Sequence, residues 1–276
     1  MHSIDLSKLL ILAIERVRAA GQLLIAEWQR PTGPRGQGDK AEIDVEIEAV
    51  LRRDLLQLLE CDFWGEETGH SLTGHQLCWV VDPNDGTSDF LRGLKGSAIS
   101  VGLLQDSVPI LGVVFAPVTE DRGADCIAWA EGMPHLLRND QEIMVDLSQQ
   151  DLTMGSPVMV SAAAASKPRL NAELCAPGVF VAMPSIAYRL ARVAAGDGVS
   201  AVSIFPLSAH DVVAGHALLR GAAGVLLDQD GQPIRYRTEA DMEIVSRRCF
   251  GGAPRACTML AARDWERILR EPESTG

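Results

Sequence analysis

Hydrophobic side chains in the first sixty residues recur at helical spacing in two stretches. The spacing predicts one helix over residues 6–29 and a second over residues 43–59. Residues 31–40 carry three glycines and two prolines, so we expect a loop there. Two interpretations of this loop stay open: a plain connector, or a mobile flap that brings Arg35 or Lys40 to a functional site.

A continuous apolar run at residues 77–81 predicts a buried strand that ends at Asp82 and Pro83. Pro83 lacks a backbone N–H and residues 84–86 are turn formers, so the chain should reverse at once. Such a turn brings Asp82 and Asp85 within about 7 Å at their Cα atoms. Two carboxylates this close repel each other unless a cation joins them, and hard oxygen ligands suit Mg²⁺.

The residues after this turn predict an anion site. Thr87, Ser88 and Asp89 are typical of a helix start, where free backbone N–H groups favour a negative charge. A metal on one side and a phosphate on the other is the layout of a phosphatase. The alternative is that the two aspartates only cap a strand and a helix.

The rest of the chain predicts a sheet followed by an α/β lobe. The expected elements are strands within residues 97–118 around a turn at 105–107, a strand at 126–130, a polar stretch at 135–155 between two lobes, strands at 158–160 and 179–182, and a helix at 186–195 capped by Ser185. Arg189 or Arg192 would lie on the polar face of that helix. We expect an N-terminal α+β lobe over residues 1–150 with the metal-binding turn, and a C-terminal α/β lobe over residues 151–276 that supplies one metal ligand.

Composition indicates an ordinary globular protein, with 47% hydrophobic and 22% charged residues in 276. The sequence has no apolar run of membrane-spanning length and no secretory leader pattern, so we expect a cytoplasmic location and no membrane partner. The six cysteines form no C-x-x-C pair, and we interpret them as reduced core thiols. The net charge of −12 argues against a nucleic-acid polymer as partner, whereas a small anion could still bind beside divalent cations.

The hexapeptide DPNDGT at residues 82–87, behind a hydrophobic strand, resembles the signature of the inositol monophosphatase superfamily. This superfamily includes inositol monophosphatases, bisphosphate nucleotidases of the CysQ type and fructose-1,6-bisphosphatases. Upstream, Asp44 and the sequence Gly65, Glu66, Glu67 have the family's order and approximate spacing. Relatives carry this Asp in a T-x-x-D context, whereas Ala41 stands at the Thr position here.

A second stretch, residues 208–231, resembles the family pattern W-D-x-A-A-G followed by a helix, A-G-G and a strand that ends in an acid. Asp211 matches the acid of this pattern, and His210 stands where Trp is usual. Without the resemblance, Asp44 and Asp211 would be interpreted as helix-end acids and Glu66 as a solvated strand end. His210 and His216 would be interpreted as surface or packing residues.

The resemblance implies the layered α/β/α/β/α sandwich of the superfamily, an α/β (α+β) fold that is often dimeric. It implies two or three Mg²⁺ ions, one held by Glu66, Asp82 and the Asn84 carbonyl and another by Asp82, Asp85 and Asp211. Thr87, linked to Asp44, would orient a metal-activated water, and the backbone N–H groups of Gly86 and Thr87 would hold the phosphate. The implied catalytic residues are Asp44, Glu66 and Thr87.

The function implied is that of a Mg²⁺-dependent phosphomonoesterase acting on a small phosphorylated metabolite, with lithium sensitivity open. The alternative is a 3′(2′),5′-bisphosphate nucleotidase, because Asp89, Phe90 and residues 231–236 are similar to CysQ-type enzymes. A third hypothesis is a catalytically inactive relative that only binds a phosphorylated metabolite. A homodimer is expected in each case.

Overall fold

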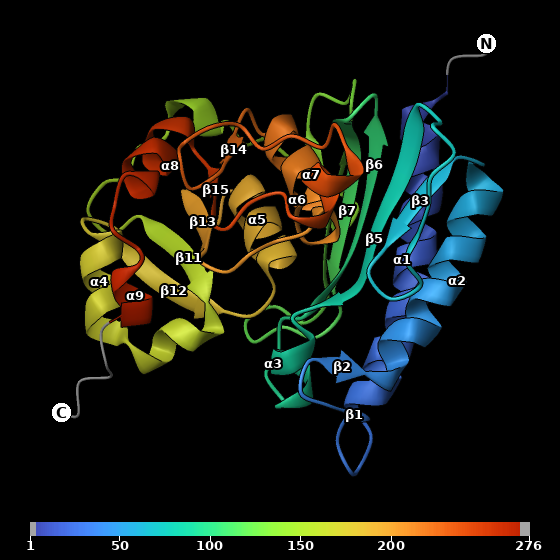
Figure 1. The fold of residues 1–276 in the computed structure, drawn as a ribbon, viewed down its shortest axis with the longest axis horizontal. Helices are drawn as coiled ribbons and strands as arrows, with labels where there is room; N and C mark the ends of the chain where they lie inside the picture. The colour runs from blue at the N-terminus through green and yellow to red at the C-terminus, as the bar shows by residue number, and fades with distance from the viewer. Residues whose placement is uncertain (1–3, 271–276) are drawn as a thin grey trace.

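The structure is a computed structural model that describes residues 4–270, which fold into two large β-sheets separated and flanked by helices, with a small two-stranded sheet beside them (Figure 1). Helices α1 (Leu6–Trp28) and α2 (Glu42–Leu58) cover the outer face of the first sheet, and α5 (Ile186–Ala194) and α6 (Ala209–Gly221) lie between the sheets. Helices α4 (Pro168–Cys175) and α8 (Pro254–Ala261) cover the outer face of the second sheet. This order of layers confirms the α/β/α/β/α sandwich.

The first sheet has eight strands in the order β10-β9-β8-β7-β6-β5-β3-β4, and the second has five in the order β12-β11-β13-β15-β14. The first comprises β3 (Asp62–Gly65), β4 (His70–Ser71), β5 (Leu77–Asp85), β6 (Ala98–Gln105), β7 (Val108–Ala116), β8 (Asp125–Ala130), β9 (Leu136–Arg138) and β10 (Gln141–Ile143). The second comprises β11 (Pro157–Ser161), β12 (Val179–Met183), β13 (Ser200–Ser203), β14 (Val225–Leu227) and β15 (Cys249–Gly252). The remaining elements are β1 (Gly36–Gln37), β2 (Lys40–Ala41), α3 (Thr87–Leu91), η1 (Leu147–Gln149), η2 (Ala162–Ser166), α7 (Glu239–Glu243) and α9 (Arg267–Arg270).

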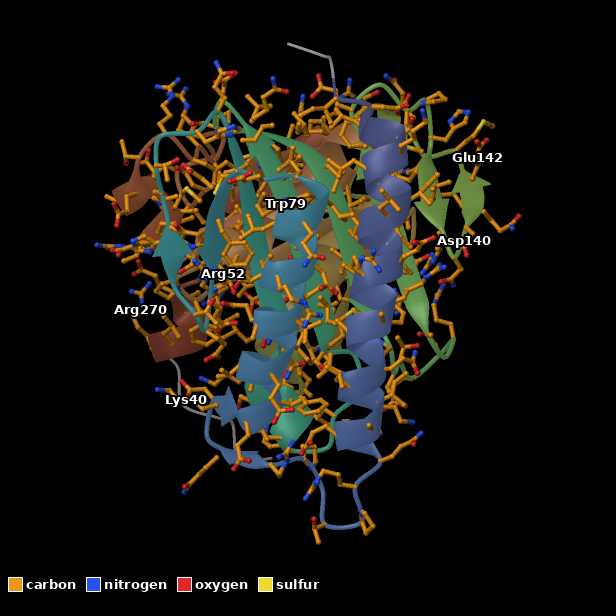
Figure 2. All side chains as sticks on the ribbon, turned by 90° about the vertical axis from the view of Figure 1, so that its right-hand side faces the viewer. Lys40, Arg52, Trp79, Asp140, Glu142 and Arg270 are labelled. Carbon is orange, nitrogen blue, oxygen red and sulfur yellow. The ribbon has the colours of Figure 1, made fainter. Side chains whose placement is uncertain are left out.

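Strand β5 contributes to two hydrophobic cores at once. Trp79 and Val81 belong to the core under α1 and α2, and Figure 2 shows Trp79 at the sheet behind these two helices. Cys78 and Val80 belong to the core between the sheets. Because successive residues of a strand point to opposite faces, a strand covered on both sides is apolar throughout. This explains the unbroken run that predicted β5.

Two glycines allow α6 to pack closely on the first sheet. Gly102 of β6 and Gly112 of β7 pair with each other, and a Cβ atom on either would overlap α6. At Gly102 it would meet the Val213 side chain at 2.6 Å, and at Gly112 the Ala214 carbonyl oxygen at 2.4 Å. This close approach brings the first turn of α6, which carries Asp211, toward β5.

The prediction that the strand ends at Asp82 was wrong, because β5 continues through Asp85. Pairing with β6 shifts register between Asp82, which faces Ser100, and Asp85, which faces Ala98. Pro83 lies in this irregular segment, where a residue without an N–H does not interrupt a regular ladder. The reversal into α3 therefore comes at Gly86, whose φ of 95° lies in the left-handed region.

Two other predicted segments contain more structure than expected. Residues 135–155 were predicted to separate two lobes, yet they include β9 and β10, which extend the first sheet. Residues 31–40 were predicted as a loop, and they include β1 and the first residue of β2, which pair as a small hairpin.

Three predicted helices agree with the structure. Helices α1, α2 and α5 begin and end within one residue of the predicted limits.

Candidate active site

Three aspartates meet where β5 ends and α6 begins. Asp82, Asp85 and Asp211 each offer a carboxylate oxygen, and these oxygens lie within 4.8 Å of one another. Asp82 and Asp85 are buried, and the side chain of Asp211 is 21% exposed. The structure thus brings together three acids that the sequence places in two separate segments.

A second group shares Asp82. Glu66, Asp82 and His210 each offer one atom, again within 4.8 Å of one another. Glu66 directly follows β3, which runs parallel to β5, and its N–H donates to the Val81 carbonyl at 3.3 Å. Parallel strands end at the same edge of a sheet, which places Glu66 beside Asp82.

The first turn of α6 fixes the Asp211 carboxylate. Ser208 precedes the helix, and its backbone N–H donates to Asp211 Oδ2 at 2.6 Å as part of a capping box. Asp211 therefore has the helix-end role that the sequence alone suggested, as the partner of the N-cap residue Ser208, and its carboxylate also faces Asp82 and Asp85. The cap and the metal-ligand hypothesis are compatible, because a carboxylate has several lone pairs.

The start of α5 fixes Asp85. Asp85 Oδ2 accepts hydrogen bonds from Ser185 Oγ and from the Ala187 N–H, both at 2.6 Å. At Gly86, a Cβ atom would lie 3.1 Å from the Ser185 nitrogen, so both the positive φ and this approach favour glycine. Ser185 was predicted only as a helix cap, a role it has toward Tyr188, and no sequence signal pointed to its contact with Asp85.

Asp44 joins the site from α2, where it is 1% exposed. Its two oxygens accept from Asn84 Nδ2 and Thr87 Oγ1, each at 3.0 Å. Thr87 Oγ1 also lies 2.9 Å from the Asn84 carbonyl oxygen. The Asp44 to Thr87 link that the resemblance implied is therefore formed although Ala41 replaces the usual Thr.

Glu48 is a buried carboxylate that the sequence analysis missed. It accepts hydrogen bonds from the Glu67 N–H at 2.9 Å and from the Thr68 N–H and hydroxyl at 2.6 Å each. These contacts fix the turn that carries Glu66. The only signal was its position four residues after Asp44, on the same face of the helix.

Burial raises the pKa of every acid in the cluster, and neighbouring acids add to the effect at several of them. The pKa rises to about 7 at Asp44, about 6 at Asp85 and about 6 at Asp211. Asp82 has a pKa well above its ordinary value, through burial and then repulsion by Glu66, Asp85 and Asp211. Glu66 keeps an exposed side, yet partial desolvation, followed by repulsion from the other acids, raises its pKa to about 8.

The donor set fits a hard divalent cation. Carboxylates and carbonyl oxygens are the ligands that Mg²⁺ takes in proteins, and a cation would offset both the burial and the repulsion that raise these pKa values. Asn84 Oδ1 is buried and has no hydrogen-bond partner in the described part of the chain. Glu66, Asp82, Asn84, Asp85 and Asp211 are the residues that could hold metal.

The cluster predicts how the stability of the metal-free protein depends on pH. The folded pKa values of about 6 to 8 at Asp44, Glu66, Asp85 and Asp211 exceed the ordinary values of 3.8 and 4.5. The folded protein therefore holds more protons than the unfolded chain between about pH 5 and 8, so this contribution to the free energy of unfolding falls as pH rises. We expect the melting temperature in EDTA to drop across this window, and saturating Mg²⁺ to reduce the drop. A melting temperature in EDTA that rises with pH would contradict the arrangement.

Arg35 and the two arginines of α5 have partners that the sequence did not predict. Arg35 forms an ion pair with buried Glu27 at 2.8 Å, so its guanidinium group is already paired within the N-terminal helices. Lys40 is exposed near the start of α2 (Figure 2). The polar face of α5 was predicted to carry Arg189 or Arg192. Arg189 does not lie there, because it is 5% exposed and donates to the Ser185 and Val202 carbonyls. Arg192 pairs with Asp121 and Asp197.

The chain is a layered α/β protein with an acidic cluster where the first sheet meets α6. Residues 5–269 match the Inositol monophosphatase family, and the chain belongs to this family. The probable inositol 1-monophosphatase ImpA of Mycobacterium tuberculosis is 30% identical over 250 residues, which cover 86% of each chain. The inositol-1-monophosphatase ImpA of Mycolicibacterium smegmatis is 31% identical over 134 residues, and that match covers 47% of this chain and 49% of the relative.

Solved structures share the fold. An inositol monophosphatase from Anabaena superposes with a TM-score of 0.71 at 23% identity, over 99% of both chains. CysQ from Bacteroides thetaiotaomicron superposes with a TM-score of 0.70 at 18% identity, over 91% of this chain and 98% of CysQ. Across the residues that the structure describes, we find no helix with the length and hydropathy of a membrane span.

Proposed function

We propose that this protein is a Mg²⁺-dependent phosphomonoesterase that hydrolyses a small phosphorylated metabolite. The observation that carries the proposal is the position of Asp82, which belongs to both groups of converging ligand atoms. A shared carboxylate suits two adjacent cations, which together can clamp a phosphate ester. Family membership and the similarity to proteins named as inositol monophosphatases support the same conclusion.

We assign Glu66, Asp82 and Asn84 to one metal position, and Asp82, Asp85 and Asp211 to another. Bound Mg²⁺ supplies Lewis acidity and lowers the pKa of a coordinated water. The protein's part is to hold these carboxylates in place, through Ser208 at Asp211 and through Ser185 and Ala187 at Asp85. The buried setting strengthens each electrostatic contact with a bound phosphate.

Thr87 and Asp44 are assigned to the attacking water. Thr87 Oγ1 carries one proton and lies near two acceptors, Asp44 Oδ2 and the Asn84 carbonyl. With its proton donated to either acceptor, Oγ1 has a lone pair free to accept a hydrogen bond from water and orient it. The backbone N–H groups of Gly86 and Thr87 are proposed to hold the phosphate.

Metal removal tests the proposal. We expect phosphate release to require Mg²⁺, to fall to background in EDTA and to return when Mg²⁺ is restored in excess. The reason is that uncompensated carboxylates repel a phosphate dianion. Circular dichroism of the EDTA sample checks that the fold persists. Full turnover in EDTA would refute the metal mechanism.

A substrate panel separates the main proposal from its alternative. The panel contains an inositol monophosphate, 3′-phosphoadenosine 5′-phosphate, histidinol phosphate and fructose 1,6-bisphosphate. Preference for the first supports the inositol monophosphatase hypothesis, and preference for the second supports the nucleotidase.

A homodimer, a cytoplasmic location and a lobe boundary near residue 150 remain predictions. The chain passes from the first sheet to the second between β10 and β11, which supports that boundary, although α5 and α6 contact both sheets.

A further inference from the structure

One of the two groups of ligand atoms contains an imidazole. A ring nitrogen of His210 lies within 4.8 Å of a carboxylate oxygen from Glu66 and from Asp82. The His210 side chain is 16% exposed, and its Nδ1 is buried without a hydrogen-bond partner among residues 4–270. The other ring nitrogen, Nε2, lies 4.0 Å from Asp211 Oδ2. A buried polar atom without a partner costs about 1–3 kcal/mol, and an imidazole ring placed beside carboxylates can bind a metal ion.

The backbone at His210 is held opposite Asp82. Ser100 pairs with Asp82 across β5 and β6, and its hydroxyl donates to the His210 carbonyl at 3.3 Å. The next residue, Asp211, is fixed by its bond from the Ser208 N–H. The contact at the His210 carbonyl and the contact at the next residue, Asp211, therefore hold the His210 backbone at the cluster, whatever its ring binds.

We infer that His210 is a ligand of the ion held by Glu66 and Asp82, which gives that position a mixed nitrogen and oxygen donor set. The inference rests on the proposed function, because it adds a ligand to one of the two proposed metal positions. Imidazole favours later transition ions over Mg²⁺, whereas the group of Asp82, Asp85 and Asp211 offers oxygen alone. The two positions therefore differ in metal preference, and the position with His210 binds Co²⁺ more tightly than an all-oxygen position does.

The competing explanation is that His210 only forms part of the pocket wall. A wall residue tolerates replacement by another ring of similar size, and its loss changes the affinity for all ions alike. A ligand contributes a bond from nitrogen to metal, and its loss weakens the later transition ions selectively. The experiment therefore needs a readout of the nitrogen itself and a comparison between ions.

Pulsed electron paramagnetic resonance of the protein loaded with enough Mn²⁺ to fill both positions gives the first readout. We expect modulation from a directly bound ¹⁴N in the unaltered protein and its loss in His210→Phe. The control is His216→Phe on the same helix, whose Nδ1 lies 2.9 Å from the Tyr236 hydroxyl, and the modulation should persist there. Bound Mn²⁺ without ¹⁴N modulation in the unaltered protein would overturn the inference, as would modulation that persists in His210→Phe.

Calorimetric titration with Co²⁺ and with Mg²⁺ gives the second readout. We expect His210→Phe to lower the Co²⁺ affinity by about 10-fold to 100-fold, the range typical of losing a contact that supports a metal site. The Mg²⁺ affinity should change by less than about threefold, because an oxygen donor or water suits Mg²⁺ as well as imidazole does. His210→Gln keeps a polar side chain with an oxygen donor and gives the same comparison if the Phe variant does not fold. Equal losses for both ions would refute the inference.

The two proposals fail separately. Phosphate release with Mg²⁺ from a protein that shows no nitrogen bound to Mn²⁺ would overturn the role of His210 and leave the phosphatase function intact. A nitrogen bound to Mn²⁺ in a protein that releases phosphate from no member of the panel would support the role of His210 and refute the phosphatase function.

Discussion

Replacing Asp82 by Asn is expected to lower turnover by roughly 10³-fold or more, because it weakens both proposed metal positions at once. Asp82 contributes to both groups of ligand atoms, and its substitution removes a negative charge from each. Phosphate release at saturating Mg²⁺, measured on the substrate that the panel identifies, gives the size of the effect.

The same substitution should leave the metal-free protein equally stable or more stable. Burial, and then repulsion by Glu66, Asp85 and Asp211, holds the pKa of Asp82 well above its ordinary value, so ionising this carboxyl group opposes folding. Asn is neutral and of similar size, and its side-chain oxygen can still accept from the Asn84 N–H, as Asp82 Oδ1 does at 2.9 Å. The melting temperature in EDTA should therefore stay level or rise.

Asp62 is the matched control for a buried aspartate with a structural role. It is 4% exposed, and it accepts from the Thr73 N–H and hydroxyl and from the N–H groups of Gly74 and His75. Burial alone would raise the pKa of Asp62, but these hydrogen bonds outweigh it and lower the value. Asp62→Asn should destabilise the protein and leave turnover per folded molecule near normal. An Asp82→Asn variant that behaved in this way would refute its assignment as a shared ligand.

The parts of the site that could be predicted from sequence are local signatures. Residues 82–87 form a strand end, a turn and a helix start within six positions, and each step depends on the residue types present. The link between Asp44 and Thr87 was available only from the resemblance, since 43 residues separate the two and no periodicity connects them. The structure adds the geometry, which shows that Asn84 shares Asp44 with Thr87.

The features that could not be predicted from the sequence depend on contacts between distant segments. The limits of β5 follow from its pairing with β6, because Asp85 rejoins the ladder opposite Ala98 after an irregular segment. Arg189 was one of two candidates for a polar face, because helical spacing cannot reveal that β13 lies against Arg189 and that Val202 accepts its hydrogen bond. In both cases tertiary contacts override a sound local pattern.

A buried ion network between the two sheets is the largest feature that the sequence analysis missed. Asp125, at the start of β8, is fully buried and accepts from Arg138 Nε at 2.8 Å and Nη2 at 2.6 Å. The Tyr188 hydroxyl of α5 donates to the same carboxylate at 2.7 Å. Asp197 pairs with both Arg138 and Arg192. The network therefore joins the first sheet to the helices between the sheets, through residues whose spacing shows no pattern.

Asp125→Asn is expected to lower the free energy of unfolding by about 3 kcal/mol, because it breaks a buried ion pair. This value lies toward the lower end of the range for such pairs, since Asp197 still pairs with Arg138 in the variant. Asp140→Asn is the matched control, since the carboxylate of Asp140 pairs with Arg18 at 2.8 Å while 62% exposed (Figure 2). An exposed pair contributes about 0–1 kcal/mol. Urea unfolding of both variants measures the difference, and Mg²⁺-saturated turnover of folded Asp125→Asn should stay near normal because Asp125 belongs to neither group of ligand atoms. Equal, small losses in the two variants would show that the network does not stabilise the junction between the sheets.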